Sequence, residues 1–585
     1  MALEEAIKVI SSALIKCCKF ISYKFHNKKI KYTYSSPKLT IQIKKELTTF
    51  DKRPLMSVVI PVFNVDKILL EKSIQSVKQQ WYKNWEIIIV NDASTYSETI
   101  DYLKTIASSK INVKSLKINA GISKTSNEAL SVAQGDYIVL MNHNDEITPN
   151  ALYEVVKEIN QSDADFIYSD EDKLEINDSY SEPHFKPDFS PELFFSQNYI
   201  SHLAAIRKTI IDKVGGWSIG VEGAQNYDLY LKVFEKTNKI SHIPKVLYHW
   251  RKIPGSTAAE FSDKSYAQEA GKRSLESAIQ RRGISAKVHN GKYPDTYRVQ
   301  YKIIDNPLIS IIIPFKDKPE LLDMCINSIL EKSSYQNYEI IGISNNSENN
   351  ETFEMMKILQ QKDDRIAFYE YDIPFNYSKI NNYAVNHYAK GEHILLLNND
   401  IEIITPDWIE ALLEFSQRKD VGTVGAKLYY PNDTIQHAGI AIGVLTLADH
   451  SFKHSPRKSP CYMGRESVTQ NVSAVTAACL MVKRTVFNQV NGLNEDKLKI
   501  AFNDVDFCLR VQEQGYLNVF TPYCEAYHHE SISRGFEDTP EKQERFASEV
   551  RYMQERHKDI LKEGDPFYNI NYTLEHENYS LKKIV

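Results

Sequence analysis

The sequence predicts an α/β protein built from two copies of one domain, each with a mostly parallel sheet covered by helices. Short β-branched runs alternate with helical stretches, which is the pattern of βαβ units. This pattern also repeats along the chain. Ser57-Val-Val-Ile-Pro-Val-Phe-Asn64 returns as Ser310-Ile-Ile-Ile-Pro-Phe-Lys-Asp317, and Glu86-Ile-Ile-Ile-Val-Asn-Asp-Ala-Ser94 returns as Glu339-Ile-Ile-Gly-Ile-Ser-Asn-Asn-Ser347, both at an offset of 253 residues. Two matches at one offset indicate a duplication.

Later segments match at larger offsets. An offset of 256 residues matches Gly135-Asp-Tyr-Ile-Val-Leu-Met-Asn-His-Asn144 to Gly391-Glu-His-Ile-Leu-Leu-Leu-Asn-Asn-Asp400. An offset of 278 residues matches Asn226-Tyr-Asp-Leu-Tyr-Leu-Lys232 to Asp504-Val-Asp-Phe-Cys-Leu-Arg510. An offset of 279 residues pairs Tyr248-His249 with Tyr527-His528. A growing offset is typical of surface loops that lengthen in one copy. A length of 585 residues also exceeds what one core accommodates.

These matches predict five segments. They are an N-terminal basic helix and linker over 1–53, a first domain over 54–255, a helical connector over 256–306, a second domain over 307–540 and a C-terminal tail over 541–585, helical at first.

The composition excludes several classes of protein. A net charge of -5 and a pI near 6.4 give no reason to expect nucleic acid as a partner. The seven cysteines form no CxxC pair, so we expect neither a structural zinc site nor a disulfide framework. No apolar run is long enough for a membrane span, and Glu4 and Glu5 replace the basic start of a signal peptide. We therefore expect a cytoplasmic protein.

The first 35 residues form a basic amphipathic pattern. Apolar residues recur there at helical spacing among several lysines: Leu3, Ile7, Ile10, Leu14, Cys17, Cys18 and Ile21. Such a helix can lie on the anionic cytoplasmic face of the inner membrane, as a peripheral anchor. It can equally dock on the protein's own surface, and the sequence leaves both alternatives open.

Polar residues stand where three of the predicted strands end, in both copies. The strand ends are Asn64 and Asp317, then Asn91-Asp92 and Ser344-Asn345-Asn346, then Asn142-His143-Asn144-Asp145 and Asn398-Asn399-Asp400. A single polar strand end is typical of a turn or a helix cap. Because ligands of open parallel sheets bind beyond the carboxyl ends of the strands, three such ends at one sheet edge predict a binding site.

The residues at these strand ends make the chain resemble the family-2 inverting glycosyltransferases of the Rossmann-like GT-A fold. More narrowly, it resembles the tandem rhamnosyltransferase-like enzymes of O-antigen and capsule assembly. The resemblance covers about residues 54–580. Further motifs that carry it are Tyr168-Ser-Asp-Glu-Asp-Lys173, Gly223-Ala-Gln225, His242-Ile-Pro-Lys-Val-Leu-Tyr-His-Trp-Arg251, Gly255-Ser-Thr257, Pro374-Phe-Asn-Tyr-Ser378, Ile435-Gln-His-Ala-Gly439, Ala501-Phe-Asn-Asp-Val-Asp506 and His528-His-Glu-Ser531.

The resemblance implies a nucleotide-sugar donor, with dTDP-rhamnose as the first to test, and a lipid-linked glycan acceptor. It assigns the catalytic base to Asp504 and metal binding to Asp400 and His528. Donor binding falls to Pro314, Asp317, Asn345, Asn346, Asn398 and Asp400. A divalent cation, Mg²⁺ or Mn²⁺, suits such an oxygen-rich site. Taken alone, His528 is more typical of an ordinary surface histidine. Ser344 departs from the family, which has an aspartate beside the nucleobase there.

The first copy departs from the family at the same positions. The metal-binding motif holds Asn142 and Asn144, the base position holds Asn226, and His249 aligns with His528. An amide has no useful basicity, so Asn226 cannot act as a general base. We expect the first copy to bind acceptor or nucleotide, or to support the second copy. As an alternative, its remaining carboxylates can substitute in a shifted geometry: Asp145, Asp170, Asp172 and Asp228.

Three other functions compete with a single active domain. A bifunctional enzyme with two active copies is the main alternative. A non-catalytic glycan-binding scaffold is disfavoured by the retained Asp400 and Asp504. A processive polysaccharide synthase is disfavoured because the chain has no QxxRW motif; Gln280-Arg-Arg-Gly lacks the tryptophan.

Overall fold

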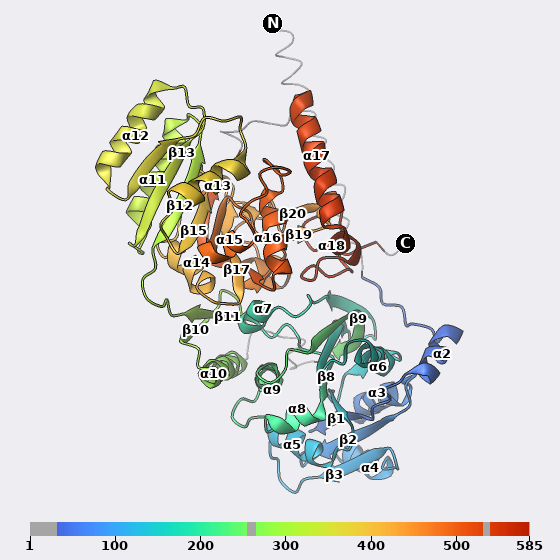
Figure 1. Cartoon of the computed structure of the whole chain (residues 1–585). Helices are drawn as coiled ribbons and strands as arrows, with labels where there is room; N and C mark the ends of the chain where they lie inside the picture. Colours follow the sequence, from blue (N-terminus) through green and yellow to red (C-terminus); the bar gives the residue numbers. More distant parts are fainter. Residues whose placement is uncertain (1–31, 254–264, 531–538, 584–585) are drawn as a thin grey trace.

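The computed structural model describes residues 32–253, 265–530 and 539–583, and it contains two large mixed sheets, one per copy (Figure 1). The helix predicted over the first residues of the chain lies outside these ranges. Within them, no helix is long and apolar enough to cross a membrane.

The first sheet has the strand order β3-β2-β1-β4-β8-β6-β9-β5, with β7 paired to β6. The four strands at one end are parallel, and β8 then runs antiparallel to both neighbours. The strands are β1 (Met56–Val62), β2 (Trp85–Asn91), β3 (Ile111–Ser115), β4 (Tyr137–Leu140), β5 (Glu146–Ile147), β6 (Phe166–Leu174), β7 (Tyr180–His184), β8 (Ala204–Arg207) and β9 (Ile240–Arg251).

The second sheet repeats this order strand for strand, as β14-β13-β12-β15-β22-β17-β23-β16. The predicted duplication of one α/β fold is therefore confirmed. Its strands are β12 (Ile309–Phe315), β13 (Tyr338–Ser344), β14 (Ile366–Glu370), β15 (His393–Leu397), β16 (Ile401–Ile403), β17 (Val421–Tyr429), β22 (Cys479–Lys483) and β23 (Leu517–His528). Also present are β18 (Ile435–His437) beside β17, β21 (Gln470–Asn471) beside β23, and the separate pair β19 (Ile440–Ile442) and β20 (Ala448–His450).

Helices cover the sheets because each carries an apolar stripe that the sheet buries. In the first copy they are α2 (Ile41–Thr49), α3 (Lys67–Lys78), α4 (Ser97–Thr105), α5 (Ile122–Val132), α6 (Ala151–Ser162), α7 (Pro191–Ser196), α8 (Lys208–Lys213) and α9 (Gln225–Phe234). In the second they are α11 (Pro319–Lys332), α12 (Asn350–Lys362), α13 (Tyr377–His387), α14 (Trp408–Ser416), α15 (Arg484–Gln489) and α16 (Asn503–Glu513), with short 3₁₀ turns η1 (Val444–Thr446) and η2 (Tyr462–Ser467).

The segment between the copies contains more than the predicted helix. Helix α10 (Ser265–Arg281) is followed by a hairpin of β10 (Ala286–Asn290) and β11 (Tyr297–Tyr301). The hairpin lies with α7 between the two halves (Figure 1). The tail begins with α17 (Pro540–Arg556) and α18 (Lys558–Glu563), and its last part, from Asp565 on, forms no further helix.

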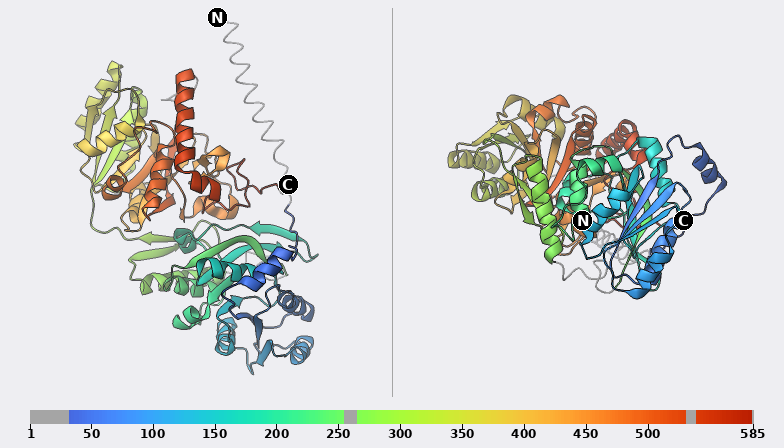
Figure 2. Two further views of the ribbon diagram at one scale, coloured as in Figure 1. Left: turned by 45° about the vertical axis from the view of Figure 1, so that its right-hand side comes forward. Right: turned by 90° about the horizontal axis from the view of Figure 1, so that it is seen from below.

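The two copies pack against each other (Figure 2) through one hydrophobic cluster that contains buried residues of both. Polar contacts reinforce this packing. Arg418 binds the buried carboxylate of Glu192 at 2.6 Å, and Ser190 binds the side chain of Asn471 at 3.0 Å. The tail also crosses to the first copy, where Asn569 donates to Asp170 at 3.1 Å. The copies are therefore built as one packed unit.

Candidate active site

The second copy brings its predicted chemical residues together beyond the carboxyl end of β15. Asn398 and Asp400 follow β15, Asp504 lies in the first turn of α16, and His528 is the last residue of β23. The hydroxyl of Tyr377, the first residue of α13, lies 3.4 Å from Asn398 Oδ1. Four elements distant in sequence thus meet at one edge of the sheet, as the strand-end pattern predicts.

Asp400 and His528 face each other in a buried position. Their side chains are 4% and 11% exposed, and His528 Nε2 lies 3.1 Å from Asp400 Oδ1. The two atoms are close but not aligned as a hydrogen bond, and Asp400 Oδ1 has no hydrogen-bond partner within the described ranges. Because a buried carboxylate oxygen without a donor is costly, this oxygen is suited to binding a cation.

Neighbouring residues set the tautomer of His528. Gln436 Nε2 donates to Glu530 at 3.0 Å, so its oxygen faces His528 Nδ1 at 2.6 Å and Nδ1 carries the proton. Asn398 Nδ2 lies 3.2 Å from Nε2 and acts as its donor. Nε2 therefore carries the lone pair with which histidine binds a metal, and a bound cation would take the place of the Asn398 N–H on it.

Asp400 and His528 fit a divalent cation that is completed by other ligands. Two ligands in adjacent octahedral positions at Mg²⁺ distances lie about 3 Å apart, close to the observed separation. Within the described residues no group of three or more His, Cys, Asp and Glu side chains is arranged to hold a metal. Such a site suits Mg²⁺ or Mn²⁺, which commonly take their remaining ligands from phosphate and water.

The charge of Asp400 is also stabilised. Burial raises the pKa of this carboxyl, whereas His528 in its protonated form, the Asp400 backbone and His529 together lower it, so that the pKa lies below its ordinary value when no cation is bound. Asp400 is therefore ionised at neutral pH, as a metal-binding carboxylate must be.

Asp504 is partly buried and held by the backbone. Its Oδ2 accepts from the Ala477 N–H at 3.1 Å, and its Oδ1 accepts from the Val505 N–H at 2.9 Å. Burial raises the pKa of Asp504, against the opposing effect of these hydrogen bonds and of the Thr476 hydroxyl. A carboxylate with a raised pKa is a better proton acceptor near neutral pH. Asp506 is instead saturated by Arg510 at 2.7 Å and His557 at 2.9 Å.

Tyr377 lies between the two carboxylates, and sequence reasoning assigned it no role. Its hydroxyl donates to the Ala477 carbonyl at 3.1 Å, and the Ala477 N–H in turn holds Asp504. Burial is the main cause that raises the pKa of Tyr377, and the charges of Asp504 and Asp400 raise it further. The only sequence signal was its place in the Pro374–Ser378 motif. Gln436, in the Ile435–Gly439 motif, was missed in the same way.

The other predicted donor-binding residues lie along the same edge. Pro314 pairs with Ile343 in the sheet, and Asp317 Oδ1 accepts from the N–H groups of Glu348 and Asn349, both at 2.9 Å. Asn345 and Asn346 donate their amides to the Ile373 carbonyl at 2.9 and 2.6 Å. Asn345 also donates to the Tyr371 carbonyl at 2.8 Å, so its amide nitrogen is fully used in holding the loop after β14 and its oxygen remains for a ligand. Asn346 keeps one N–H and its oxygen for a ligand.

The β-ladders correct one alignment between the copies. Ile147 pairs with Tyr248, and its equivalent Ile403 pairs with Ala526. This register gives an offset of 278 rather than 279, so Trp250, not His249, occupies the position of His528. The Lys173 ammonium lies 3.0 Å from the centroid of the Trp250 ring. An indole under a lysine thus stands in the first copy where the second copy has the His528 imidazole. His249 instead pairs with Asp172 at 2.5 Å.

The amides of the first copy do not reproduce the site. Asn142 donates to Asp145 at 2.7 Å, and Asp145 also accepts from the Tyr248 hydroxyl and the Arg251 N–H, so its oxygens are occupied. The backbone carbonyl of Asn144 accepts from the Arg251 guanidinium at 3.1 Å. At the base position, Asn226 accepts from the indole of Trp217 at 3.0 Å.

The remaining carboxylates of the first copy are held in structural contacts as well. Asp170 binds His242 at 2.9 Å and the tail residue Asn569, and Asp172 binds Tyr32 at 2.7 Å. Asp228 pairs with Lys232 at 3.3 Å. These contacts disfavour the alternative in which a displaced carboxylate replaces the missing ones. The Tyr168–Lys173 motif here ties both ends of the described chain to the first copy.

Comparison with known proteins agrees with this geometry. Residues 57–215 and 310–490 match the model of Glycosyl transferase family 2, and together they make up more than half of the chain. The chain belongs to glycosyl transferase family 2.

Two curated relatives match almost the whole chain. An uncharacterized protein of Sinorhizobium fredii, y4gI, is 44% identical over 90% of this chain and 58% of its own length. The O-antigen biosynthesis protein RfbC of Myxococcus xanthus is 36% identical over 91% of this chain and 41% of its own length. The chain thus spans about half the length of these relatives. Among solved structures it is similar to S. aureus TarS 1-349 in complex with UDP-GlcNAc, with a TM-score of 0.32, 20% identity, and 38% and 66% of the two chains covered.

Proposed function

We propose that the second copy is an inverting glycosyltransferase that moves a sugar from a nucleotide-sugar donor to a lipid-linked surface polysaccharide, and that the first copy transfers nothing. The observation that carries the proposal is Tyr377, whose hydroxyl contacts both the proposed donor-binding residue Asn398 and the Ala477 carbonyl beside the proposed base Asp504.

The transfer is a single displacement. The acceptor hydroxyl attacks the anomeric carbon, the bond from that carbon to the diphosphate oxygen breaks, and the nucleoside diphosphate leaves with the electron pair. Asp504 takes the hydroxyl proton as the new bond forms. Asp400 and His528 would hold a divalent cation, which would supply positive charge to the leaving diphosphate. Asp504 suits the task because burial raises its pKa while the backbone fixes its orientation.

The biological setting is inferred more indirectly. The name of the Myxococcus xanthus relative supports surface polysaccharide as the product class. Rhamnose remains the first sugar to test, on the family resemblance alone. Peripheral attachment to the cytoplasmic face of the inner membrane rests on the basic pattern of residues 1–31.

The test is donor turnover by the full chain with Mn²⁺, polysaccharide acceptor and either dTDP-rhamnose or a panel of UDP- and GDP-sugars. We expect Asp504→Asn to abolish release of the nucleoside diphosphate and Asn226→Ala to leave it unchanged. Full activity in Asp504→Asn would contradict the assignment of the base. Loss of a distinct transfer in Asn226→Ala would favour a bifunctional enzyme, and no turnover with any donor would favour a scaffold.

A further inference from the structure

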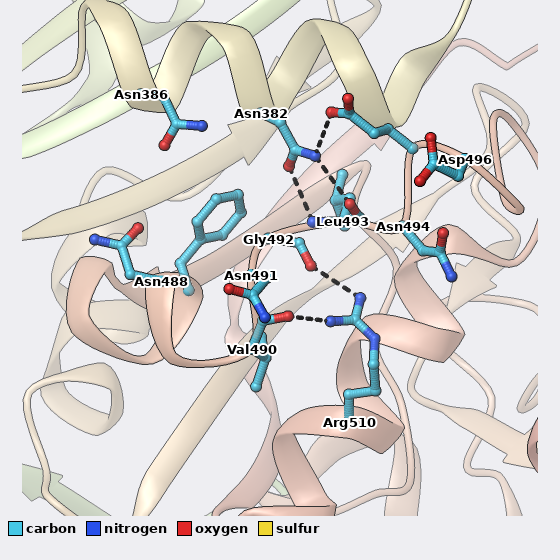
Figure 3. A pocket seen from close by; sticks show the side chains of 12 residues that line it. Asn382, Asn386, Asn488, Val490, Asn491, Gly492, Leu493, Asn494, Asp496 and Arg510 are labelled. Atoms are coloured by element: carbon cyan, nitrogen blue, oxygen red, sulfur yellow. Dashed lines mark hydrogen bonds between the residues drawn. The ribbon is translucent and has the colours of Figure 1, made fainter.

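A separate hollow of about 580 Å³ is lined by residues of the helices that carry the candidate active site and of the loop beside them (Figure 3). Tyr377 is the first residue of α13 and Asp504 lies in the first turn of α16, and both helices contribute lining residues further along. At 1.5 Å per residue, those residues lie about 7–14 Å along the helices from their active-site ends. The lining is asparagine-rich and comprises Asn382, Asn386, Phe487, Asn488, Val490, Asn491, Gly492, Leu493, Asn494, Glu495, Asp496 and Arg510.

The wall of the hollow is fixed by side chains beneath it. Asn382 accepts from the Leu493 N–H and donates to the Leu493 carbonyl, both at 2.9 Å. Arg510 donates to the carbonyls of Val490 and Gly492 at 2.5 and 2.9 Å. Gly492 has a φ of +64°, and a Cβ there would lie 2.5 Å from Asn382 Oδ1. The loop is thus held in one shape, which lowers the entropic cost of binding a ligand.

Three lining asparagines have amides that are free for a ligand, although Asn491 also occupies a left-handed backbone position, with φ +58°, that favours asparagine or glycine. Asn386, Asn488 and Asn491 are exposed, and none of their amides hydrogen-bonds another described residue. Figure 3 shows Asn386 and Asn488 at the hollow without a bond to another residue drawn there, in contrast to Asn382 and Arg510. Each amide offers two donors and one acceptor oxygen.

The first copy provides an internal comparison. Equivalent hydrogen bonds hold the corresponding loop there: Asn127 bonds the N–H and the carbonyl of Trp217, and Lys232 donates to the Gly216 carbonyl. The positions of Asn386, Asn488 and Asn491 are held there by Ser131, Asp212 and Gly215. Gly215, with φ +77°, and Asn491 both suit the left-handed backbone at their shared position, so the fold accounts for Asn491 in part. The first copy folds without the amides of Asn386 and Asn488, so the fold does not require these two. They occur in the copy that has the catalytic carboxylates.

The chemistry of the hollow points to a neutral, hydroxyl-rich ligand. Arg510 is neutralised by Asp506 at 2.7 Å, and the other charged lining residues are Glu495 and Asp496, which repel phosphate. Uncharged amides that both donate and accept match sugar hydroxyls, and the volume lies within the usual range of ligand pockets. We propose that this hollow is a second glycan-binding site, which holds neutral sugar residues of the acceptor away from its reacting end. The proposal rests on the proposed function in taking the acceptor to be a glycan.

The test measures binding without transfer. The probe is surface polysaccharide released by mild acid from cells that make this protein, titrated calorimetrically into the full chain with no donor present. We expect the Asn386→Ala, Asn488→Ala, Asn491→Gly triple variant to bind about tenfold more weakly or worse; glycine at 491 keeps the left-handed backbone, as Gly215 does in the first copy. The matched control is Ser131→Ala with Asp212→Ala, at the equivalent exposed positions of the first copy, which we expect to bind like the wild type.

Equal binding by the triple variant and the wild type, or no binding by the wild type, would overturn the proposal. Binding is also measured in Asp504→Asn, which we expect to retain it. If the wild-type protein binds the polysaccharide through these asparagines but transfers no sugar, the proposed function is wrong and the second glycan-binding site is still supported.

Discussion

Replacement of Gln436 by leucine is expected to weaken metal binding without touching a metal ligand. Gln436 is 3% exposed, and leucine fills a similar volume. The change removes the acceptor that lies 2.6 Å from His528 Nδ1 and the donor to Glu530 at 3.0 Å. The His528 proton is then free to move to Nε2, where it occupies the lone pair directed at Asp400.

The magnitude follows from this shift of the proton. Loss of a residue that orients a metal-binding histidine typically weakens metal affinity by about 10–100-fold. This corresponds to about 1.4–2.7 kcal/mol. The hydrogen bond lost by His528 is worth about 0.5–1.5 kcal/mol. We therefore expect a folded protein with reduced metal affinity and near-normal turnover at saturating metal.

The assay is a titration of Mn²⁺ into the full chain with nucleoside diphosphate, followed by the electron paramagnetic resonance signal of free Mn²⁺. Gln436→Glu is the matched variant, because a carboxyl retains an acceptor for His528 Nδ1. We expect it to bind Mn²⁺ more tightly than Gln436→Leu. If Gln436→Leu binds Mn²⁺ as the wild type does, the role assigned to His528 is wrong.

Three further predictions concern the base, the bridging tyrosine and the contact between the copies. Burial raises the pKa of Asp504, which must be ionised to act, so kcat/KM should fall with decreasing pH at a value above the ordinary aspartate pKa of about 3.9. If kcat/KM falls only at or below about pH 3.9, the assignment of Asp504 as a base with a raised pKa is wrong. Tyr377→Phe removes the 3.1 Å bond to Ala477 and should lower kcat by about 2–13-fold, with Mn²⁺ affinity unchanged; an unchanged kcat contradicts it. Asp170→Asn weakens the contacts with His242 and Asn569 and should lower the free energy of unfolding by about 1–3 kcal/mol in urea denaturation. An unaltered denaturation midpoint would show that this contact is dispensable.

The fold was predictable because its evidence is local and repeated. The two sequence matches at an offset of 253 residues each cover a predicted strand and the polar residues that follow it. When helices connect parallel strands, the carboxyl ends of those strands meet at one edge of the sheet. The position of Asn398 and Asp400 at that edge follows from that rule, whereas Asp504 lies at the start of helix α16. The roles of Tyr377 and Gln436 do not follow from it, because each depends on which backbone group a loop presents to it.

Two other features required the structure for physical reasons. The Tyr-His pairs at 248 and 527 suggest an alignment, but only the ladder partners of β9 and β23 set the register, and Trp250 replaced His249. The acidic motif around Asp170 looked chemical in sequence. Its partners Tyr32 and Asn569 lie far away along the chain, so no local pattern showed that it joins the copies.

The central claim is that Asp504 of the second copy is the base and that the first copy has none. The most direct test compares acceptor-dependent release of nucleoside diphosphate by Asp504→Asn, Asn226→Ala and the wild type. We expect Asp504→Asn to lose about 10²–10⁴-fold in kcat, the contribution of a general base.

The same variants carry their own control for folding. Burial raises the pKa of Asp504 in the folded state, so its ionised form destabilises the fold at neutral pH, and an amide has no such cost. Asp504→Asn should therefore melt at or above the wild-type temperature. A well-folded Asp504→Asn with wild-type turnover, or an Asn226→Ala variant as inactive as we expect Asp504→Asn to be, would contradict the account.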